Sequence, residues 1–315
     1  KWTLWSPIII CMNIGGLNLA PSDSASILIK DGWFSEAEVM WPGQRFCIKV
    51  DKVLLNGKSQ FQDILVFNSS TYGVVLVLDG AIQVTERDEF AYQEMISQIP
   101  LFASNNPPKK VLIVGGGDGG VLREVAKHAS VEEIHMCEID QQVCEVGKKF
   151  FNTTLATSFN DPRLKLFYDD AARYLRLEGK GQNYDAIICD SSDPVGPAAT
   201  LYTPEFYQSM SDALAPGGVV CTQGECQWLH VDFIKEVMER AREIFPTVQY
   251  AYSTVPSYPS GQLGFIVAAK EAGVDLSVPR RVVPADMSLR YYSSAMHSAA
   301  FVLPAFAARK LLARS

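Results

Sequence analysis

Apolar and polar positions alternate over short runs in the first third of the chain. Between Arg45 and Glu86 these runs have the period of two that β-strands require, and residues typical of turns separate them. The expected turns lie at Asn56-Gly57, at Asn68 to Tyr72 and at Asp79-Gly80. This pattern predicts a small antiparallel sheet.

After this sheet the pattern changes to a helical period. Residues Arg87 to Phe102 predict a helix that stops at Pro100, and residues 105–110 predict a linker. Short apolar runs then alternate with helix-length segments, which is typical of a parallel sheet covered by helices on both faces. The clearest helix, His230 to Phe245, repeats its apolar residues at i, i+3 and i+4 and should bury one face. The expected strands are Val111 to Val114, Ile134 to Glu138, Leu164 to Tyr168, Ala186 to Cys189, Val219 to Thr222 and Gly264 to Ala268.

These patterns indicate an α/β protein with two domains. We expect a small N-terminal antiparallel β domain with a connecting helix over residues 31–104, and a Rossmann-like, doubly wound sheet over residues 105–315. Residues 1–30 are expected to be a leader or a disordered extension. Their apolar run, Trp5 to Ala20, is broken by glycines and polar residues and is too short for a membrane span.

A glycine-rich loop follows the first strand of the large domain, in the stretch VLIVGGGDGG from Val111 to Gly120. Such loops let a ligand approach the backbone, although a tight strand-to-helix turn without a ligand gives the same pattern. Glu138 ends the next strand, about 20 residues further on, where a carboxylate can accept hydrogen bonds from ribose hydroxyls. Asp118 lies inside the loop, and its charge disfavours a phosphate there. We therefore expect a nucleoside without phosphate, with a positive charge near Asp118, such as a sulfonium nucleoside.

Carboxylates gather where the expected strands end. Because ligands of such sheets bind beyond the carboxyl ends of the strands, this edge is the expected site. Each residue taken singly is also typical of a solvated charge or a helix cap. A metal site is the competing interpretation, but the four histidines show no metal-ligand spacing, so we expect no metal. The residues are Asp118, Glu138, Asp169, Asp190, Asp193 and Glu225.

Composition adds two expectations. The chain has 315 residues, 48% of them apolar, and a net charge of −7, which argues against nucleic-acid binding and suits a cationic ligand. Its seven cysteines are odd in number, form no CxxC pair and lie partly in apolar runs. They predict reduced thiols and a cytoplasmic protein without membrane attachment.

Several long motifs together resemble the spermidine synthase family of aminopropyltransferases. They include GWFSE, WPGQ, GGGDGGVLREV, CEID, DSSDPVGPA, QGECQWLH and YPSGQLGF, and the resemblance spans about Asp31 to Leu311. It implies a methyltransferase-type Rossmann-like domain behind the β domain, assembled as a homodimer or a dimer of dimers. It also implies aminopropyl transfer from decarboxylated S-adenosylmethionine to putrescine, giving spermidine and methylthioadenosine. The donor is then a co-substrate, and no cofactor is expected.

The resemblance also implies roles for individual residues. Glu138 would hold the ribose hydroxyls of the donor, Asp169 its adenine amine, and Asp118 with Gln93 and Gln62 its aminopropyl end. Where the family often has Asp-Gly, this chain has Asp169-Asp170, and we group Asp170 with the donor-binding residues. Asp190 would be the catalytic base at the attacking nitrogen. The residues expected around putrescine are Tyr92, Asp190, Asp193, Gln223, Glu225 and Tyr258.

Three alternatives stay open. A spermine or thermospermine synthase would differ in the length of the acceptor, and a putrescine N-methyltransferase would use intact S-adenosylmethionine. The stretch QGECQWLH followed by Val231-Asp232 resembles the synthases rather than the methyltransferases. A non-catalytic, nucleoside-binding partner subunit is the alternative from another class, and intact Asp190, Asp193, Tyr92 and Tyr258 argue against it.

Overall fold

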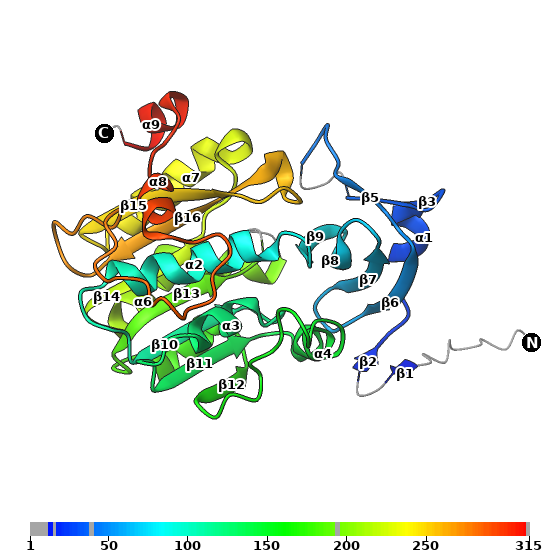
Figure 1. Cartoon of the computed structure of the whole chain (residues 1–315), viewed down its shortest axis with the longest axis horizontal. Coiled ribbons are helices and arrows are strands. Elements are labelled where there is room, and N and C mark those ends of the chain that lie inside the picture. Colours follow the sequence, from blue (N-terminus) through cyan, green and yellow to red (C-terminus); the bar gives the residue numbers. More distant parts are fainter. Residues whose placement is uncertain (1–11, 15–16, 38–40, 193–195, 313–315) are drawn as a thin grey trace, which may run out of the picture.

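The computed structural model describes residues 12–14, 17–37, 41–192 and 196–312. Its larger part is a seven-stranded sheet with the strand order β12-β11-β10-β13-β14-β16-β15. The first five strands are parallel, and β16 pairs antiparallel with both of its neighbours. Helices cover both faces, and the N-terminal strands form a separate layer at one end of the molecule (Figure 1). The predicted doubly wound sheet with a small N-terminal β domain is therefore confirmed.

The elements of the large sheet alternate along the chain. Its strands are β10 (Lys110–Gly115), β11 (Glu133–Glu138), β12 (Leu164–Tyr168), β13 (Tyr184–Asp190), β14 (Leu214–Gln223), β15 (Thr247–Thr254) and β16 (Gln262–Ala269). The helices around it are α2 (Glu89–Ala103), α3 (Gly120–Ala126), α4 (Gln141–Phe150), α5 (Ala171–Tyr174), α6 (Pro204–Ala213), α7 (Gln227–Arg242), α8 (Ser294–Ala299) and α9 (Ala305–Leu311). Short turns of π-helix, η1 (Leu175–Gly179), and of 3-10 helix, η2 (Gly196–Tyr202) and η3 (Pro259–Gly261), complete this part.

The central strands are apolar on both faces because helices pack on each. Along β10, Val111 and Ile113 join the core beneath α2 and α3, whereas Leu112 and Val114 join the core beneath α6 and α7. This period of two follows from the pleat of a strand. Buried on both sides, these strands are continuous apolar runs, which is why they are recognisable in the sequence.

Two expectations about this sheet are wrong in detail. The sheet is mixed rather than all-parallel, because β16 runs antiparallel, and β15 was not predicted. Only Tyr250, Ala251 and Ser253 of β15 are buried, and its other residues are partly or fully exposed because the strand lies at the edge of the sheet. Its pattern therefore lacks the continuous apolar run of the central strands.

Two helix ends also differ from the predictions. Helix α2 continues through Pro100 to Ala103 because Ile99, Leu101 and Phe102 are fully buried in the core, and this burial outweighs the hydrogen bond that proline cannot donate. Helix α7 begins at Gln227, before the predicted start, and has non-helical backbone angles at His230.

The predicted antiparallel sheet of the N-terminal domain has four strands in the order β6-β7-β8-β9. Its strands are β6 (Lys52–Lys58), β7 (Asp63–Ser69), β8 (Gly73–Leu78) and β9 (Ala81–Thr85). A three-stranded sheet of β3 (Ile29–Lys30), β4 (Trp33–Ser35) and β5 (Cys47–Lys49) lies beside it. The turns at Asn68 to Tyr72 and at Asp79-Gly80 are confirmed. Asn56-Gly57, however, lies within β6, where a Cβ on Gly57 would come within 2.9 Å of the Cβ of Leu19.

Part of the expected disordered extension is ordered. A hairpin of β1 (Met12–Ile14) and β2 (Leu17–Leu19) leads into helix α1 (Ser24–Leu28). Leu17 and Leu19 are buried in a core that includes Val143 and Phe151 near the large domain's α4. The described part of residues 1–30 is therefore folded, while residues 1–11 and 15–16 lie outside the described residues.

Packing assigns the connecting helix α2 to the large domain. Met95, Ile96 and Ile99 contribute to the core beneath the seven-stranded sheet, so the helix lies with that sheet rather than with the N-terminal one. Within the described residues, no helix is long and apolar enough to span a membrane.

Candidate active site

A pocket opens where the parallel strands of the large sheet end and the N-terminal domain begins. The loops after β10, β11, β12, β13 and β14 form one wall, and residues from β8 and β9 form the other. Of the predicted site residues, the pocket is lined by Gln62, Tyr92, Asp118, Glu138, Asp169, Asp170, Asp190, Gln223, Glu225 and Tyr258. The sequence therefore predicted the edge of the sheet that carries the pocket. Asp193 lies outside the described residues.

The glycine-rich loop is shaped by protein contacts as well as by space for a ligand. Gly115 has a φ of +75°, and a Cβ on it would lie 2.1 Å from the carbonyl oxygen of Asp190. The Gly116 N–H donates to the same oxygen at 3.1 Å. A side chain at Gly115 would therefore displace the strand end that carries Asp190.

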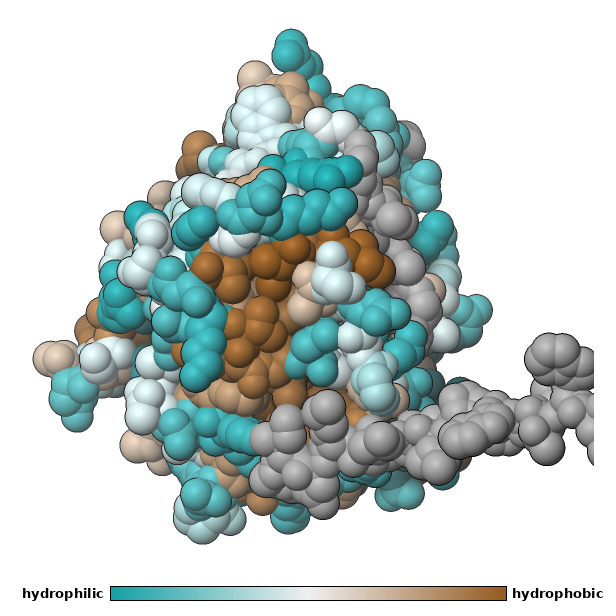
Figure 2. All heavy atoms as spheres, turned by 90° about the vertical axis from the view of Figure 1, so that its right-hand side faces the viewer, coloured by the Kyte–Doolittle hydropathy of each residue, from teal (hydrophilic) through white to brown (hydrophobic). Residues whose placement is uncertain are grey.

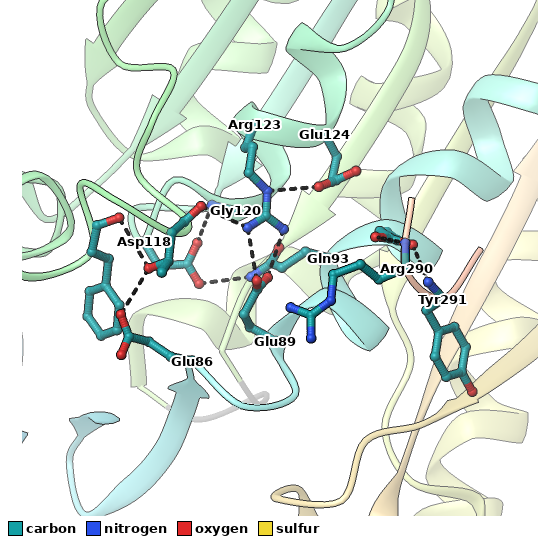
Figure 3. Close-up of polar contacts among 12 residues, drawn as sticks. Glu86, Glu89, Gln93, Asp118, Gly120, Arg123, Glu124, Arg290 and Tyr291 are labelled. Carbon is teal, nitrogen blue, oxygen red and sulfur yellow. Dashed lines mark hydrogen bonds and ion pairs between the residues drawn. The ribbon is translucent and has the colours of Figure 1, made fainter. Parts of the chain in front are cut away.

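Asp118 is held from two directions within the loop. The Gly120 N–H donates to its Oδ1 at 2.7 Å, and Nε2 of Gln93 on α2 donates to its Oδ2 at 2.9 Å (Figure 3). Burial and the nearby carboxylate of Glu89 raise the pKa of Asp118 to about 6, against the lowering effect of these donors and of Arg123. Gln93 thus holds the carboxylate of Asp118 in place through a hydrogen bond and does not itself line the pocket.

Asp190 ends β13 and receives a hydrogen bond from Tyr92. The hydroxyl of Tyr92 donates to Oδ1 of Asp190 at 2.6 Å. Burial, followed by repulsion from Asp118, raises the pKa of Asp190 to about 8, although the Tyr92 hydrogen bond lowers it. A cation placed between these carboxylates would reverse this repulsion and favour both charged forms.

Glu138 ends β11, and both of its carboxylate oxygens accept backbone hydrogen bonds. The Gly117 N–H donates to Oε2 at 3.1 Å and the Asp140 N–H to Oε1 at 2.9 Å. Burial is the main reason that its pKa is raised, to about 7. Each carboxylate oxygen has a second lone pair, which leaves room for hydroxyl donors of a ligand.

Asp169 and Asp170 follow β12 and make different contacts. Asp169 forms an ion pair with Arg173 and accepts the Asp170 N–H at 2.8 Å. Asp170 is the N-cap of α5, since its Oδ1 accepts the N–H groups of Ala172 and Arg173 at 2.7 and 3.2 Å. The cap explains an acidic side chain at this position without a ligand.

Gln62 reaches the large domain through Asp140. Its Nε2 donates to Oδ2 of Asp140 at 2.9 Å, and the hydroxyl of Ser59 donates to the same oxygen at 2.6 Å. Asp140 also caps α4 through the Gln142 N–H. Gln62 is thus placed at the pocket by an interdomain contact, which the sequence did not predict.

Gln223 and Glu225 lie on the loop after β14. Oε1 of Gln223 accepts from the hydroxyl of Tyr202 at 3.1 Å and from the Glu225 N–H at 3.3 Å. Oε2 of Glu225 lies 2.7 Å from Nδ1 of His230. Its other oxygen, Oε1, is buried and has no hydrogen-bond partner in the described residues, so it is an acceptor available to a donor in the pocket.

Tyr258 is fixed at the pocket by two groups of the N-terminal half. Its hydroxyl donates to the carbonyl oxygen of Gln83 at 2.6 Å, and its ring lies 5.6 Å from that of Tyr92. The preceding loop residue, Ser257, donates its N–H to Oδ2 of buried Asp88 at 2.7 Å. An aromatic wall beside Asp190 is suited to an alkyl chain with charged ends.

Sequence reasoning missed the contribution of the N-terminal sheet to the pocket. Leu76, Leu78 and Ile82 line it, together with Trp41. In the sequence, the strand residues could not be distinguished from ordinary core positions. Trp41 stands in the motif WPGQ, which was the available signal. The described residues contain no group of three or more His, Cys, Asp or Glu side chains placed to hold a metal ion.

A methyltransferase-like sheet whose strand ends carry carboxylates around one pocket is an architecture typical of group transferases. Comparison with known proteins identifies the family. Residues 89–278 match the model of the spermine/spermidine synthase domain, and residues 32–86 match that of the spermidine synthase tetramerisation domain. The chain belongs to the spermidine synthase family and is an aminopropyltransferase.

Individual relatives are similar over most of their length. Spermidine synthase 2 of Arabidopsis thaliana is 50% identical, with 94% of this chain and 88% of the relative covered. Spermidine synthase of Schizosaccharomyces pombe is 52% identical, with 89% and 94% covered. The structure of a spermidine synthase in complex with the transition-state analogue AdoDATO is 36% identical, has a TM-score of 0.82, and covers 90% of this chain and 95% of its own. Spermidine synthase from Thermotoga maritima has a TM-score of 0.81 at 36% identity, with 90% and 94% covered.

Proposed function

We propose that this protein is a spermidine synthase that transfers the aminopropyl group of decarboxylated S-adenosylmethionine to putrescine. One observation carries the proposal. Two half-buried carboxylates, Asp118 and Asp190, lie in the same pocket with raised pKa values, an arrangement that is costly unless cations occupy the pocket. Both proposed substrates are cationic. The names of the similar proteins above support the same reaction.

The donor would bind along the ends of β10, β11 and β12. Glu138 would accept the ribose hydroxyls, Asp169 the adenine amine, and Asp118 the terminal ammonium of the aminopropyl group. Intact S-adenosylmethionine carries a carboxylate at that end, and a like charge placed against Asp118 in a desolvated pocket costs several kcal/mol. Asp118 would thus disfavour methyl transfer from the intact donor.

Asp190 would act as the catalytic base on putrescine. Its carboxylate takes a proton from the attacking ammonium, and the neutral nitrogen displaces the thioether in line. The new C–N bond forms as the C–S bond breaks, and the electron pair passes to sulfur, which leaves as neutral methylthioadenosine. The sulfonium charge of the donor favours this proton transfer by disfavouring a second cation beside it. Tyr92 and Tyr258 would orient the diamine, and Gln223 and Glu225 would hold its distal ammonium, with Asp193 as a further expected partner.

The variant Asp190→Asn tests this assignment. We expect turnover to fall by about 100-fold or more, since a positioned general base contributes that much. The affinity for methylthioadenosine should stay within about twofold, because the amide keeps the shape and the Tyr92 hydrogen bond. Turnover at the wild-type rate would remove Asp190 from the role of base.

We also propose that the chain assembles as a homodimer or a dimer of dimers through its N-terminal domain. The matching model over residues 32–86 is that of a tetramerisation domain. Figure 2 looks onto the side that carries this domain, and hydrophilic side chains frame a hollowed hydrophobic area there. Trp33 and Val53 are exposed hydrophobic residues of the domain. Light scattering on the full chain measures the assembly, and a monomer would contradict it.

We also propose that the protein is located in the cytoplasm. The six cysteines that the structure describes are unpaired, which suits a reducing compartment.

A further inference from the structure

A buried cation lies behind Asp118 and outside the pocket. Arg123 of α3 reaches α2 and forms a two-pronged ion pair with Glu89, at 2.9 Å from Nη1 to Oε1 and 2.8 Å from Nη2 to Oε2 (Figure 3). Its guanidinium also donates to Glu124 at 2.8 Å and to the carbonyl oxygen of Thr154 at 3.0 Å. These ion pairs raise the pKa of Arg123, so the group stays charged although it is largely buried. Arg123 does not line the pocket.

The ion pair joins the two helices that supply the donors to Asp118. Glu89 lies one helical turn before Gln93, whose amide holds Oδ2 of Asp118, and Arg123 lies one turn after Gly120, whose N–H holds Oδ1. The helices approach closely here, because a Cβ on Gly120 would lie 2.3 Å from the side chain of Gln93. A shift of α2 against α3 would therefore separate Asp118 from one of its two donors.

The pair also balances the charge around Asp118. Glu89 raises the pKa of Asp118 and Arg123 lowers it, so the two effects oppose each other while both residues are present. From the other elements around the pocket, Asp190 of β13 and Glu138 of β11 face the same space, and their pKa values are raised to about 8 and about 7, so each adds negative charge only in its ionised form; Tyr92 of α2 is neutral. Without Arg123, the charge of Glu89 would stand uncompensated among these carboxylates.

We propose that Arg123 is a positioning residue for donor choice, which neutralises Glu89 and ties α2 to α3 so that Asp118 remains a fixed, charged acceptor for the donor's ammonium. This inference rests on the proposed function, since it needs Asp118 to bind that ammonium. It assigns to a residue outside the pocket a part in distinguishing the decarboxylated donor from nucleosides that lack the ammonium.

Calorimetry tests this role of Arg123. The affinities for decarboxylated S-adenosylmethionine and for methylthioadenosine are measured as a function of pH. The second ligand has no ammonium and reports on the rest of the site. In Arg123→Met we expect the affinity for the donor to fall by about tenfold or more near pH 7, while that for methylthioadenosine stays within about twofold. The loss should shrink above about pH 8, where Asp118 regains its charge. Equal losses for both ligands would reduce Arg123 to a structural role and overturn the inference.

Glu89→Gln should shift the pKa of Asp118 in the opposite direction, downward, because Glu89 raises it. This variant tests the inference even if Arg123→Met does not fold. Removing the Glu89 charge leaves Arg123 paired with Glu124, so the pH below which donor affinity is lost should move down by about one unit. An unchanged pH dependence would overturn the inference. Arg163→Met is the matched control, because Arg163 pairs with Asp161 and donates to backbone carbonyls away from the pocket. In this variant the ratio of donor affinity to methylthioadenosine affinity should equal that of the wild type.

Asp118→Asn separates the inference from the proposed function. If this variant leaves the ratio of donor to methylthioadenosine affinity unchanged, the proposed contact of Asp118 fails, and the inference fails with it. If it lowers the ratio while Arg123→Met and Glu89→Gln do not change it, the inference alone is wrong.

Discussion

The hydroxyl of Tyr92 lies 2.6 Å from Oδ1 of Asp190 and joins α2 to the end of β13. Two opposing effects act on the pKa of Asp190 here. Burial favours the neutral acid of Asp190, and the hydrogen bond favours its carboxylate. A carboxyl group must be ionised before it can take a proton, so under the proposed role of Asp190 this contact should affect the rate of the reaction.

Removing this hydrogen bond should shift the pH dependence of the reaction. In Tyr92→Phe the pKa of Asp190 rises further, so the acid limb of kcat/KM should move to higher pH by about one unit. Activity near pH 7 should fall by about tenfold and recover in part as the pH rises. A pH–rate profile measures both. The matched control is Tyr258→Phe, whose hydroxyl donates to Gln83 rather than to Asp190 and whose loss should leave the limb in place.

Binding of the donor should release protons. In the free protein the pKa of Asp190 is about 8 and that of Asp118 about 6, so near pH 7 Asp190 is mainly protonated. A bound sulfonium and ammonium lower both pKa values, which drives protons off. Calorimetry in two buffers of different ionisation enthalpy should find about half a proton or more released with decarboxylated S-adenosylmethionine. Neutral methylthioadenosine should release fewer, and equal release for the two ligands would contradict this electrostatic coupling.

Variants of Asp170 can distinguish its role as the N-cap of α5 from a direct contact with the donor. Asp170→Ala should lower the free energy of unfolding by about 1 kcal/mol through loss of the α5 cap, and Asp170→Ser should restore most of it. Donor affinity should change by less than about twofold in the serine variant. Denaturant unfolding and calorimetry measure the two quantities. A large loss of donor affinity in Asp170→Ser would instead support the direct contact that the sequence led us to expect.

The sheet and the edge that carries the site are predictable from the sequence because both depend on local signals. Central parallel strands are continuous apolar runs, and their carboxyl ends share one edge, so the amino-acid pattern alone places Asp118, Glu138 and Asp190 together. The edge strand β15 and the ordered hairpin of β1 and β2 were missed because their residues are only partly buried or lie in short, broken runs.

Contacts between distant segments could not be predicted in this way. Gln62 is held by Asp140, and Arg123 pairs with Glu89, and each contact depends on how two domains or two helices pack. The resemblance to the spermidine synthase family indicated many of the site residues. It did not reveal which of them line the pocket and which hold another site residue in place. Gln93 belongs to the second group.

The most direct test of the proposed reaction is a product assay on the purified full chain with putrescine as acceptor. Decarboxylated and intact S-adenosylmethionine are offered in parallel, and the polyamines and nucleosides formed are identified by mass. We predict spermidine and methylthioadenosine from the decarboxylated donor alone, because the proposed contact of Asp118 with the donor's ammonium would disfavour the intact donor. N-methylputrescine from the intact donor, or no product from either donor in a protein that still binds methylthioadenosine, would contradict the proposal.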